Sequence, residues 1–313
     1  MVRALLRNGC DLRGLTGLDS LDYETVSGDV LDRESIRKGI KGCDWCFHVA
    51  ASYHLWLPDY RPMYRVNVDG SQNVIEAAME ADCSRIVYTS TVGCIGITHK
   101  TGITEPPADE TQDPRPENLT NPYKSSKWLA ELKVRELISR GAPVVMVCPT
   151  APIGPYDVKP TPTGKIVLDF LKGEMPAFLD TGLNWVHVRD VAAGHVLAAE
   201  RGRIGERYIL GNKEGNWMMK EMLEVLGDIT GLKVPHIRIP YGVALAAAYV
   251  DETISRFTHK PPRAPIAGVR MAAYRMFFNP EKAIRELGLP QTPSRQAFED
   301  AVTWFEQNFL DRR

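Results

Sequence analysis

The sequence predicts an α/β protein with a parallel β-sheet whose two faces are covered. The first half of the chain alternates short β-branched runs with helical stretches, which is the pattern of consecutive βαβ units. The 313 residues are 44% hydrophobic and 25% charged, which suffices for one large domain or two smaller ones. No internal repeat or low-complexity segment indicates another class of architecture.

Several short apolar runs have the composition of buried strands. They are rich in Val, Ile, Tyr and Thr. Helical patterns separate them, and in residues 67–78 apolar side chains recur at the spacing of a crossover helix packed on a sheet. The predicted strands are residues 2–6, 23–26, 45–49, 85–89, 144–148, 185–188 and 207–210, and the predicted helices are 33–40, 66–81, 123–140, 190–199 and 297–309.

Segments 148–155 and 159–164 are rich in proline and glycine and mark a boundary in the chain. After Asn212 the pattern becomes largely helical. An apolar helix around residues 243–254 is expected to pack on the second domain, with contact to a membrane or a partner as the alternative. The predicted larger domain comprises residues 1–152 and 185–212, and the predicted smaller, mostly helical domain comprises residues 153–184 and 213–313.

Composition and charge argue against several classes of function. The net charge of −1 gives no electrostatic case for nucleic acid or anionic lipid. No stretch approaches the roughly 20 apolar residues of a membrane span, and no signal-peptide pattern is present, so we expect a cytoplasmic protein. Cys43 and Cys46 lack further ligands at zinc spacing, so no metal site is expected. The cysteines interpreted as packing residues are Cys46, Cys83, Cys94 and Cys148.

The most informative motif is Tyr123-Lys-Ser-Ser-Lys127. A tyrosine and a lysine four residues apart lie on one face of a helix. Asn121 and Pro122 just ahead form a suitable start, because asparagine favours the N-cap and proline the first turn. A neighbouring ammonium favours the phenolate, so we expect the pKa of Tyr123 to fall toward the range of proton transfer at neutral pH. A surface helix with a stray tyrosine is the alternative.

The predicted strands end in residues suited to binding a ligand. In open parallel sheets, ligands bind beyond the carboxyl ends of the strands. An aspartate there can accept a hydrogen bond from an adenine amino group, and small residues allow a flat ring to approach the backbone. A guanidinium after a strand could clamp a ribose phosphate, with a solvated loop arginine as the alternative. These strand ends carry Arg7, Asp29, Val30, Val49, Ala50, Ala51, Thr89, Ser90, Thr91, Pro149 and Thr150.

Together these positions resemble the extended branch of the short-chain dehydrogenase/reductase superfamily over nearly the whole chain. Further segments resemble one subgroup in particular, the hopanoid-associated sugar epimerases, which are similar in turn to dihydroflavonol 4-reductases. These segments are Tyr53–Trp56, Asp157–Gly164, Asp180–Asn184 and Gly205–Gly211.

The resemblance implies a Rossmann domain, which is a doubly wound parallel sheet that binds NAD(P), and a smaller substrate domain. It implies a catalytic set in which Thr91 takes the Ser/Thr place, Tyr123 is the acid and base, and Lys127 is its partner. Substrate contacts are expected at Tyr53, Trp56, Asn184 and His187, whereas Asp190 is expected to cap a helix. The residues expected at NADP or NAD are Arg7, Asp29, Val30, Val49, Ala50, Ala51, Thr89, Tyr123, Lys127 and Pro149.

One part of the family pattern is absent from the sequence. The family opens with a strand and a Gly-x-x-Gly-x-x-Gly turn that holds the cofactor pyrophosphate, whereas residues 1–5 resemble its second strand. The missing strand would lie mid-sheet, so both neighbouring strands should carry unpaired backbone groups, at about 1–3 kcal/mol for each buried group. We expect that the sequence starts too late or is truncated; a genuine variant with poor cofactor affinity is the alternative. Smaller departures are Thr91 in place of serine and Arg189 in place of an acidic residue.

The sequence leaves three functions open. The first is an NAD(P)-dependent sugar-nucleotide epimerase/dehydratase-type enzyme in which Tyr123 removes a hydroxyl proton. The second is an NADPH-dependent reductase of a ketone or aldehyde, which Arg7 favours. The third is a non-catalytic nucleotide-binding protein, which the missing phosphate loop favours and the Thr91, Tyr123 and Lys127 set opposes. The expected partner is a small molecule, either a sugar nucleotide or a carbonyl compound, and not a nucleic acid; homodimer formation is left open.

Overall fold

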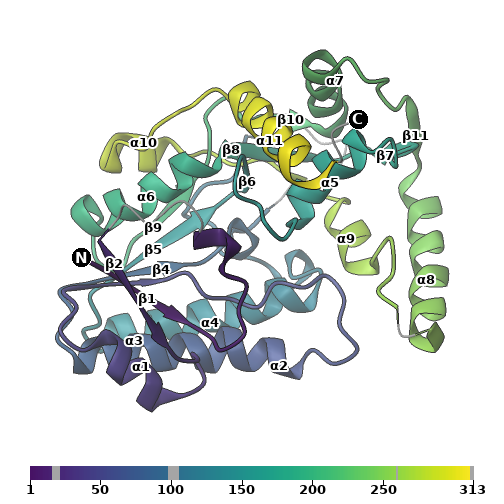
Figure 1. Cartoon of the computed structure of the whole chain (residues 1–313). Coiled ribbons are helices and arrows are strands. Elements are labelled where there is room, and N and C mark those ends of the chain that lie inside the picture. The colour runs from purple at the N-terminus through teal and green to yellow at the C-terminus, as the bar shows by residue number, and fades with distance from the viewer. Residues whose placement is uncertain (16–21, 98–105, 259, 311–313) are drawn as a thin grey trace.

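The computed structural model has a parallel main sheet between two layers of helices and a second group of short strands and helices beside it (Figure 1). It describes residues 1–15, 22–97, 106–258 and 260–310. The predicted α/β class is confirmed. The main sheet has four parallel strands in the order β3 (Trp45–His48), β4 (Arg85–Thr89), β5 (Val144–Pro149) and β9 (Arg207–Leu210).

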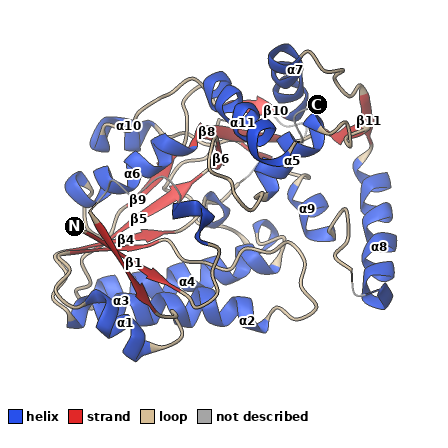
Figure 2. Ribbon diagram, viewed as in Figure 1, coloured by secondary structure: helices blue, strands red, loops and turns tan. Residues whose placement is uncertain are grey.

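Helices cover both faces of the main sheet, as the near-continuous apolar strands require (Figure 2). Side chains alternate along β4 with the strand period of two: Ile86 and Tyr88 pack on one layer of helices, whereas Val87 packs on the other. The first layer contains α1 (Arg33–Ile40), α3 (Gly70–Glu80) and α4 (Pro122–Ser139); the second contains α6 (Val188–Arg201) and α10 (Glu281–Leu287).

The strands β1 (Val2–Leu6) and β2 (Tyr23–Ser27) form a separate parallel pair. Among the described strands, β1 is hydrogen-bonded to β2 alone and β3 to β4 alone, so each has one unpaired edge. One side of β3 is also uncovered, since Trp45 and Phe47 are each 41% exposed. The free edges of β1 and β3 lie where the sequence predicts unpaired strands, and the absence of a strand between them stays a prediction.

A second sheet is centred on β8 (Gly182–His187). The predicted strand 185–188 coincides with the end of β8, and β8 pairs with strands outside the main sheet. The predicted domain boundaries place this strand in the larger domain; those boundaries stay a prediction. The strands that pair with β8 are β6 (Ala151–Ile153), β10 (Asn216–Met218) and β12 (Arg275–Met276). The hydrophobic core beside this sheet includes side chains of three helices: α5 (Pro162–Leu171), α7 (Met219–Thr230) and α11 (Ser294–Phe309).

Three details differ from the sequence prediction. The first residues of the helix predicted at 66–81 belong to a π-helical turn that leads directly into α3, and the region after Asn212 includes short strands as well as helices. The apolar helix predicted around 243–254 is present but packs through one side only, on α9. The further elements are α2 (Arg61–Tyr64), the π-helical turn Arg65–Asp69, β7 (Ala177–Leu179), β11 (Ile237–Ile239), α8 (Tyr241–Thr258), α9 (Ile266–Met271) and the 3₁₀ turns η1 (Leu12–Leu15), η3 (Val92–Cys94) and η4 (Pro116–Asn118).

Candidate active site

Helix α4 begins where the sequence predicts. Asn121 is its N-cap, and its Oδ1 accepts a hydrogen bond from the Lys124 backbone N–H at 2.9 Å. Pro122 occupies the first helical position, where its missing N–H costs nothing. This start sets the phase of the helix, so that Tyr123 and Lys127 lie one turn apart at the carboxyl edge of β4.

Tyr123 lies in an apolar setting that keeps its phenol protonated. The ring of Tyr53 packs against it, with 4.3 Å between the ring centroids. Burial raises the pKa of Tyr123 well above its usual range, and a hydrogen bond with Thr91 offsets this only in part. The prediction that Lys127 lowers the pKa of this phenol is wrong for this arrangement, because desolvation dominates and the lysine ammonium is engaged elsewhere.

Lys127 ties α4 to the end of β4. Its Nζ donates to the Thr89 carbonyl oxygen at 2.8 Å and to the Tyr88 hydroxyl at 3.1 Å, and it lies 4.6 Å from the centroid of the Tyr88 ring. The side chain is buried, which lowers the pKa of Lys127 to about 8. The ammonium is therefore fixed at the strand end, in the wall of the site.

Thr91 completes the set at the same edge. Its Oγ1 accepts a hydrogen bond from the Gly93 N–H at 3.1 Å, as the N-cap of η3. Because that bond uses an acceptor lone pair, the hydroxyl proton remains available to donate toward Tyr123 or a ligand oxygen. The structure thus brings Thr91, Tyr123 and Lys127 together, as the sequence motifs predict.

Asn67 is a site residue that the sequence reasoning missed. It lies on the π-helical turn, is 1% exposed, and connects α4 with the loop that carries Tyr53. Its Oδ1 accepts from the Ser52 N–H at 2.7 Å, while its Nδ2 donates to the Ser52 carbonyl at 3.0 Å and to the Ser126 hydroxyl at 2.9 Å. Such π-helical insertions are frequent at functional sites. An asparagine within an apolar helical pattern was the available signal.

Glu131 was also missed. It is fully buried one turn beyond Lys127 and accepts hydrogen bonds from the hydroxyl of Ser90, from Arg135 at 2.8 Å and from Arg207 at 3.2 Å. Ser90 directly precedes Thr91, so the carboxylate links the start of β9 to the end of β4. This buried ion-pair network holds the strand end that carries the candidate catalytic hydroxyl.

The predicted cofactor residues after β1, β2 and β3 lie on open surface or in turns. Arg7 is exposed beyond β1. The carboxylate of Asp29 accepts from the Leu31 N–H at 2.9 Å and so shapes the turn after β2, where Val30 packs against Gly70. The small-residue stretch after β3 is exposed and lies at the unpaired strand edge; it comprises Val49, Ala50 and Ala51.

Thr89 contributes only its backbone at this edge, because its hydroxyl is 2.9 Å from Nε2 of His195 on the opposite face of the sheet. Pro149 ends β5 and is half-buried. At the start of α4, Thr120 Oγ1 and Asn121 Nδ2 are buried and have no hydrogen-bond partner among the described residues, as expected at a wall shaped for a polar ligand.

These residues fit the two ends of a dinucleotide. Asp29 can accept a hydrogen bond from an adenine amino group, the exposed Arg7 suits a ribose phosphate, and Lys127 beside Tyr123 suits a nicotinamide ribose. The pyrophosphate is less well provided for: among the described residues, β1 is followed by the short turn η1 rather than by a helix with free N-terminal amides. The fit therefore rests on the adenosine and nicotinamide ends.

Two predicted substrate residues have their hydrogen bonds satisfied by the protein. Asn184 is 1% exposed and its amide binds Asn212 and Asn216. His187 is buried, accepts from the Arg189 N–H and lies 3.1 Å from Asp300. Both contact patterns favour packing roles. The predicted cap is wrong as well: His187 is the N-cap of α6, and the carboxylate of Asp190 accepts hydrogen bonds from Thr292 instead.

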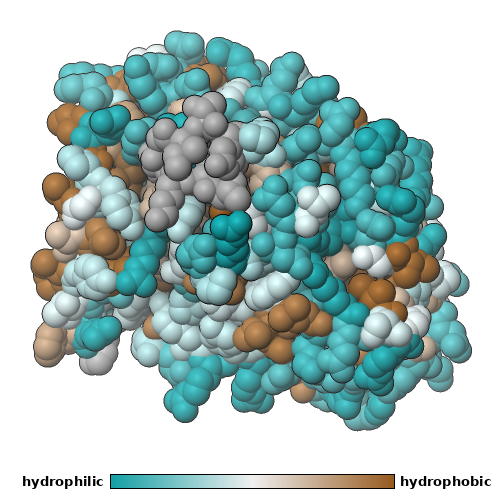
Figure 3. Space-filling view, turned by 180° about the vertical axis from the view of Figure 1, so that it is seen from behind, coloured by the Kyte–Doolittle hydropathy of each residue, from teal (hydrophilic) through white to brown (hydrophobic). Residues whose placement is uncertain are grey.

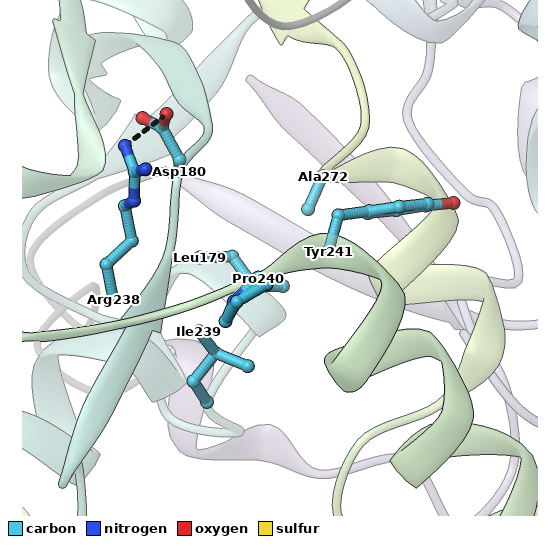
Figure 4. Close-up of a pocket in the computed structure, with 7 residues that line it drawn as sticks. All are labelled: Leu179, Asp180, Arg238, Ile239, Pro240, Tyr241 and Ala272. Carbon is cyan, nitrogen blue, oxygen red and sulfur yellow. Dashed lines mark hydrogen bonds and ion pairs between the residues drawn. The ribbon is translucent and has the colours of Figure 1, made fainter.

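The aromatic residues after β3 remain candidates for the substrate side. The ring of Tyr53 packs on that of Tyr123, and Tyr53 is 38% exposed. Trp56 lies in the same loop and is half-buried. A separate cavity of about 180 Å³ lies between β7, β11 and the start of α8 (Figure 4). Apart from the Asp180–Arg238 ion pair at 3.1 Å, its lining is mostly apolar: Leu179, Ile239, Pro240, Tyr241 and Ala272.

His48 is a strand residue whose ring is satisfied by the Ser71 hydroxyl at 2.9 Å, and burial lowers its pKa to about 3. Cys83, Cys94 and Cys148 are buried and Cys46 packs on the core, in agreement with their interpretation as packing residues.

In the described part of the chain, no group of His, Cys, Asp and Glu side chains could hold a metal ion. No helix within those residues is long and apolar enough to cross a membrane.

Comparison with known proteins places this geometry in a family. The model of the NAD dependent epimerase/dehydratase family matches residues 1–211. The chain belongs to this family. The resemblance to extended short-chain dehydrogenases/reductases is thus confirmed at that level, and the protein is an NAD(P)-dependent oxidoreductase of the epimerase, dehydratase or reductase type.

Two named proteins and one solved structure resemble this family member over nearly its whole length. A Synechocystis sp. protein provisionally named dihydroflavonol 4-reductase is 41% identical over 98% of this chain and 91% of its own. Sterol demethylase protein B of Methylococcus capsulatus is 31% identical over 98% and 94%. The crystal structure of gox2253 superposes with a TM-score of 0.83 at 40% identity, covering 99% of this chain and 92% of that one.

Proposed function

We propose that this protein is an NAD(P)H-dependent reductase that converts a ketone on an apolar, ring-containing small molecule to the alcohol. The observation that carries the proposal is the Tyr123 phenol beside the Thr91 hydroxyl at the strand edge, packed against the ring of Tyr53. Reduction of a carbonyl needs a proton donor at the oxygen, whereas an epimerase must first remove a hydroxyl proton. The names of the two full-length relatives, a flavonol-type reductase and a sterol-processing protein, support an apolar ring substrate.

The residues of the chain position and protonate the substrate oxygen. Thr91 and Tyr123 both present hydroxyl groups to one point, so a carbonyl oxygen placed there accepts two hydrogen bonds and takes its proton from Tyr123. Lys127, whose ammonium is held at the strand end by the Thr89 carbonyl oxygen, would bind the nicotinamide ribose. NAD(P)H, when bound, supplies the hydride.

The surroundings of Tyr123 suit an apolar ring. The Tyr53 ring packs on it at 4.3 Å, and a flat substrate replacing part of that contact would keep the phenol away from water. Trp56 in the same loop offers a second aromatic surface. For the cofactor, Arg7 would contact a ribose phosphate, which favours NADPH over NADH.

The test is NADPH consumption with a flavanone or steroid ketone by the wild type and by Tyr123→Phe. General acid catalysis contributes about 10²–10⁴-fold, so kcat of the variant should fall by at least about a hundredfold while NADPH affinity stays nearly constant. Tyr53→Phe keeps its ring and is the matched control. Thr91→Ser should retain activity and Thr91→Val should lose it. Full turnover by Tyr123→Phe would end the proposal.

A sugar-nucleotide epimerase is the second candidate, because the matched family includes epimerases by name. It predicts interconversion of two sugar nucleotides with no net consumption of NADPH. Detecting that interconversion, together with no oxidation of NADPH by any ketone, would replace the reductase proposal with this one. The assignment to the sugar-epimerase subgroup and the homodimer remain predictions.

A further inference from the structure

Helix α8 stands at the edge of the molecule with one apolar side uncovered. Ala248 and Ser255 are buried on the side that packs on α9. On the other side, exposed apolar residues follow one another at spacings of four and three along the whole helix. We call this set the α8 stripe: Val243 (60% exposed), Ala247, Val250 (61%), Ile254 (53%) and Phe257 (82%).

Charge is distributed unevenly around this helix. Both acidic residues of α8 are half-buried and bind the segment that follows the helix: the Asp251 carboxylate accepts from the Ala264 N–H at 2.9 Å, and that of Glu252 accepts from the Ile266 N–H at 2.7 Å. At the carboxyl end of the stripe, three basic side chains are exposed and have no ion pair among the described residues. This basic cluster consists of Arg256, Lys260 and Arg263.

We propose that the α8 stripe and its basic cluster dock the protein on the surface of a membrane that contains anionic lipid. An apolar helical face flanked by basic residues lies in the interface plane, with apolar side chains among the acyl chains and cations at the headgroups. Figure 3 shows hydrophobic groups along the edge where α8 lies, on the left of that view, beside a mainly hydrophilic surface. The net charge of −1 of the whole chain does not show this local arrangement, in which both acids of α8 are hydrogen-bonded to backbone amides and the three basic side chains are exposed.

A second copy of the chain fits this face less well than a lipid surface. The helix has 18 residues, so it is about 27 Å long, and a face about 10 Å wide covers about 300 Å². A stable protein interface needs about 800 Å² on each partner. Parallel pairing would bring two basic clusters together, and antiparallel pairing would set each cluster against the positive N-terminal end of the partner helix.

Docking would also place the apolar cavity at the membrane side of the molecule. Tyr241, the first residue of α8, and Pro240 before it both line that cavity (Figure 4). The helix that carries the stripe therefore also borders that mostly apolar cavity. The docking itself does not depend on the reaction, and its test needs no substrate.

The test is flotation of the full chain with vesicles of phosphatidylcholine and phosphatidylglycerol in equal parts, against phosphatidylcholine alone. The wild type should bind the anionic vesicles, and binding should weaken as salt is raised. Ile254→Ser with Phe257→Ser should reduce binding at least tenfold. Ile204→Ser is the matched control, because Ile204 is equally exposed (53%) but lies between α6 and β9.

The basic cluster is tested by Lys260→Glu, which should weaken binding to anionic vesicles at least fivefold, since each basic residue near such a surface contributes about that factor. Lys38→Glu, at an exposed position of α1, is its control. Hydrogen exchange of the wild type needs no variant: vesicles should protect the amides of residues 243–257. Absence of binding to anionic vesicles, equal binding to neutral ones, or a dimer in solution that Phe257→Ser dissociates would overturn the proposal.

Discussion

Replacing Lys124 with methionine should stabilise the protein. Lys124 is in the first turn of α4, is 2% exposed, and has no hydrogen bond or ion pair from its ammonium among the described residues. A buried ammonium without a partner loses its hydration and gains no compensating charge. Methionine has nearly the same length and no charge, so it fills the space without that cost.

The magnitude follows from the pKa of Lys124, which burial lowers from 10.5 to about 8. Below pH 8 the folded and unfolded states both hold the proton, so the folded state bears the whole penalty of about 3 kcal/mol. Between pH 8 and 10.5 the folded state releases its proton before the unfolded state does, and the wild type gains stability as the pH rises. The advantage of Lys124→Met should therefore be about 3 kcal/mol at pH 7 and close to zero near pH 10.5.

The assay is urea unfolding of both proteins, followed by circular dichroism at pH 7 and pH 10.5, and compared as the difference in free energy of unfolding. Other groups titrate in both proteins and cancel in that difference. Lys127→Met is the matched control: the pKa of Lys127 is also lowered to about 8, but its ammonium donates to Thr89 and Tyr88, so its removal should stabilise less. A loss of stability in Lys124→Met at pH 7 would refute the reasoning.

Three further predictions concern the frame of the site. Asn67→Ala leaves the Ser52 N–H and carbonyl without their side-chain partner and removes the donor to the Ser126 hydroxyl, so the free energy of unfolding in urea should fall by about 2–4 kcal/mol and kcat should fall; an unchanged midpoint would contradict this. Glu131→Gln removes one of the two carboxylates that pair with the buried Arg207, the other being Asp113 at 3.0 Å, and should destabilise by about 1–3 kcal/mol in thermal or urea unfolding, whereas a gain would show the pair to be dispensable. Backbone amides of β1 and β2 should exchange with deuterium faster than those of β4 and β5, as mass spectrometry would show; equal protection would mean that the free edges are covered.

Much of the fold could be predicted from the sequence because the signals were local. Strands 2–6, 85–89 and 207–210 were predicted with the bounds that the structure has, and the Asn121-Pro122 start fixed α4. Apolar alternation and capping act within a few residues, so they are visible in the chain itself. The pairing of β8 was not visible, since its partners come from segments far apart in the sequence.

The candidate site, like the fold, could be predicted only in part from the sequence. Helix periodicity in the chain by itself placed Tyr123 and Lys127 on one helix face, and the family resemblance of the sequence added Thr91 to the predicted set. Only the tertiary structure decided that the Tyr123 phenol stays protonated, that Asn67 and Glu131 hold the frame, and that the Asn184 and His187 side chains are already satisfied. Those outcomes depend on burial and on hydrogen-bond partners brought from distant parts of the chain, and local residue patterns carry no measure of either.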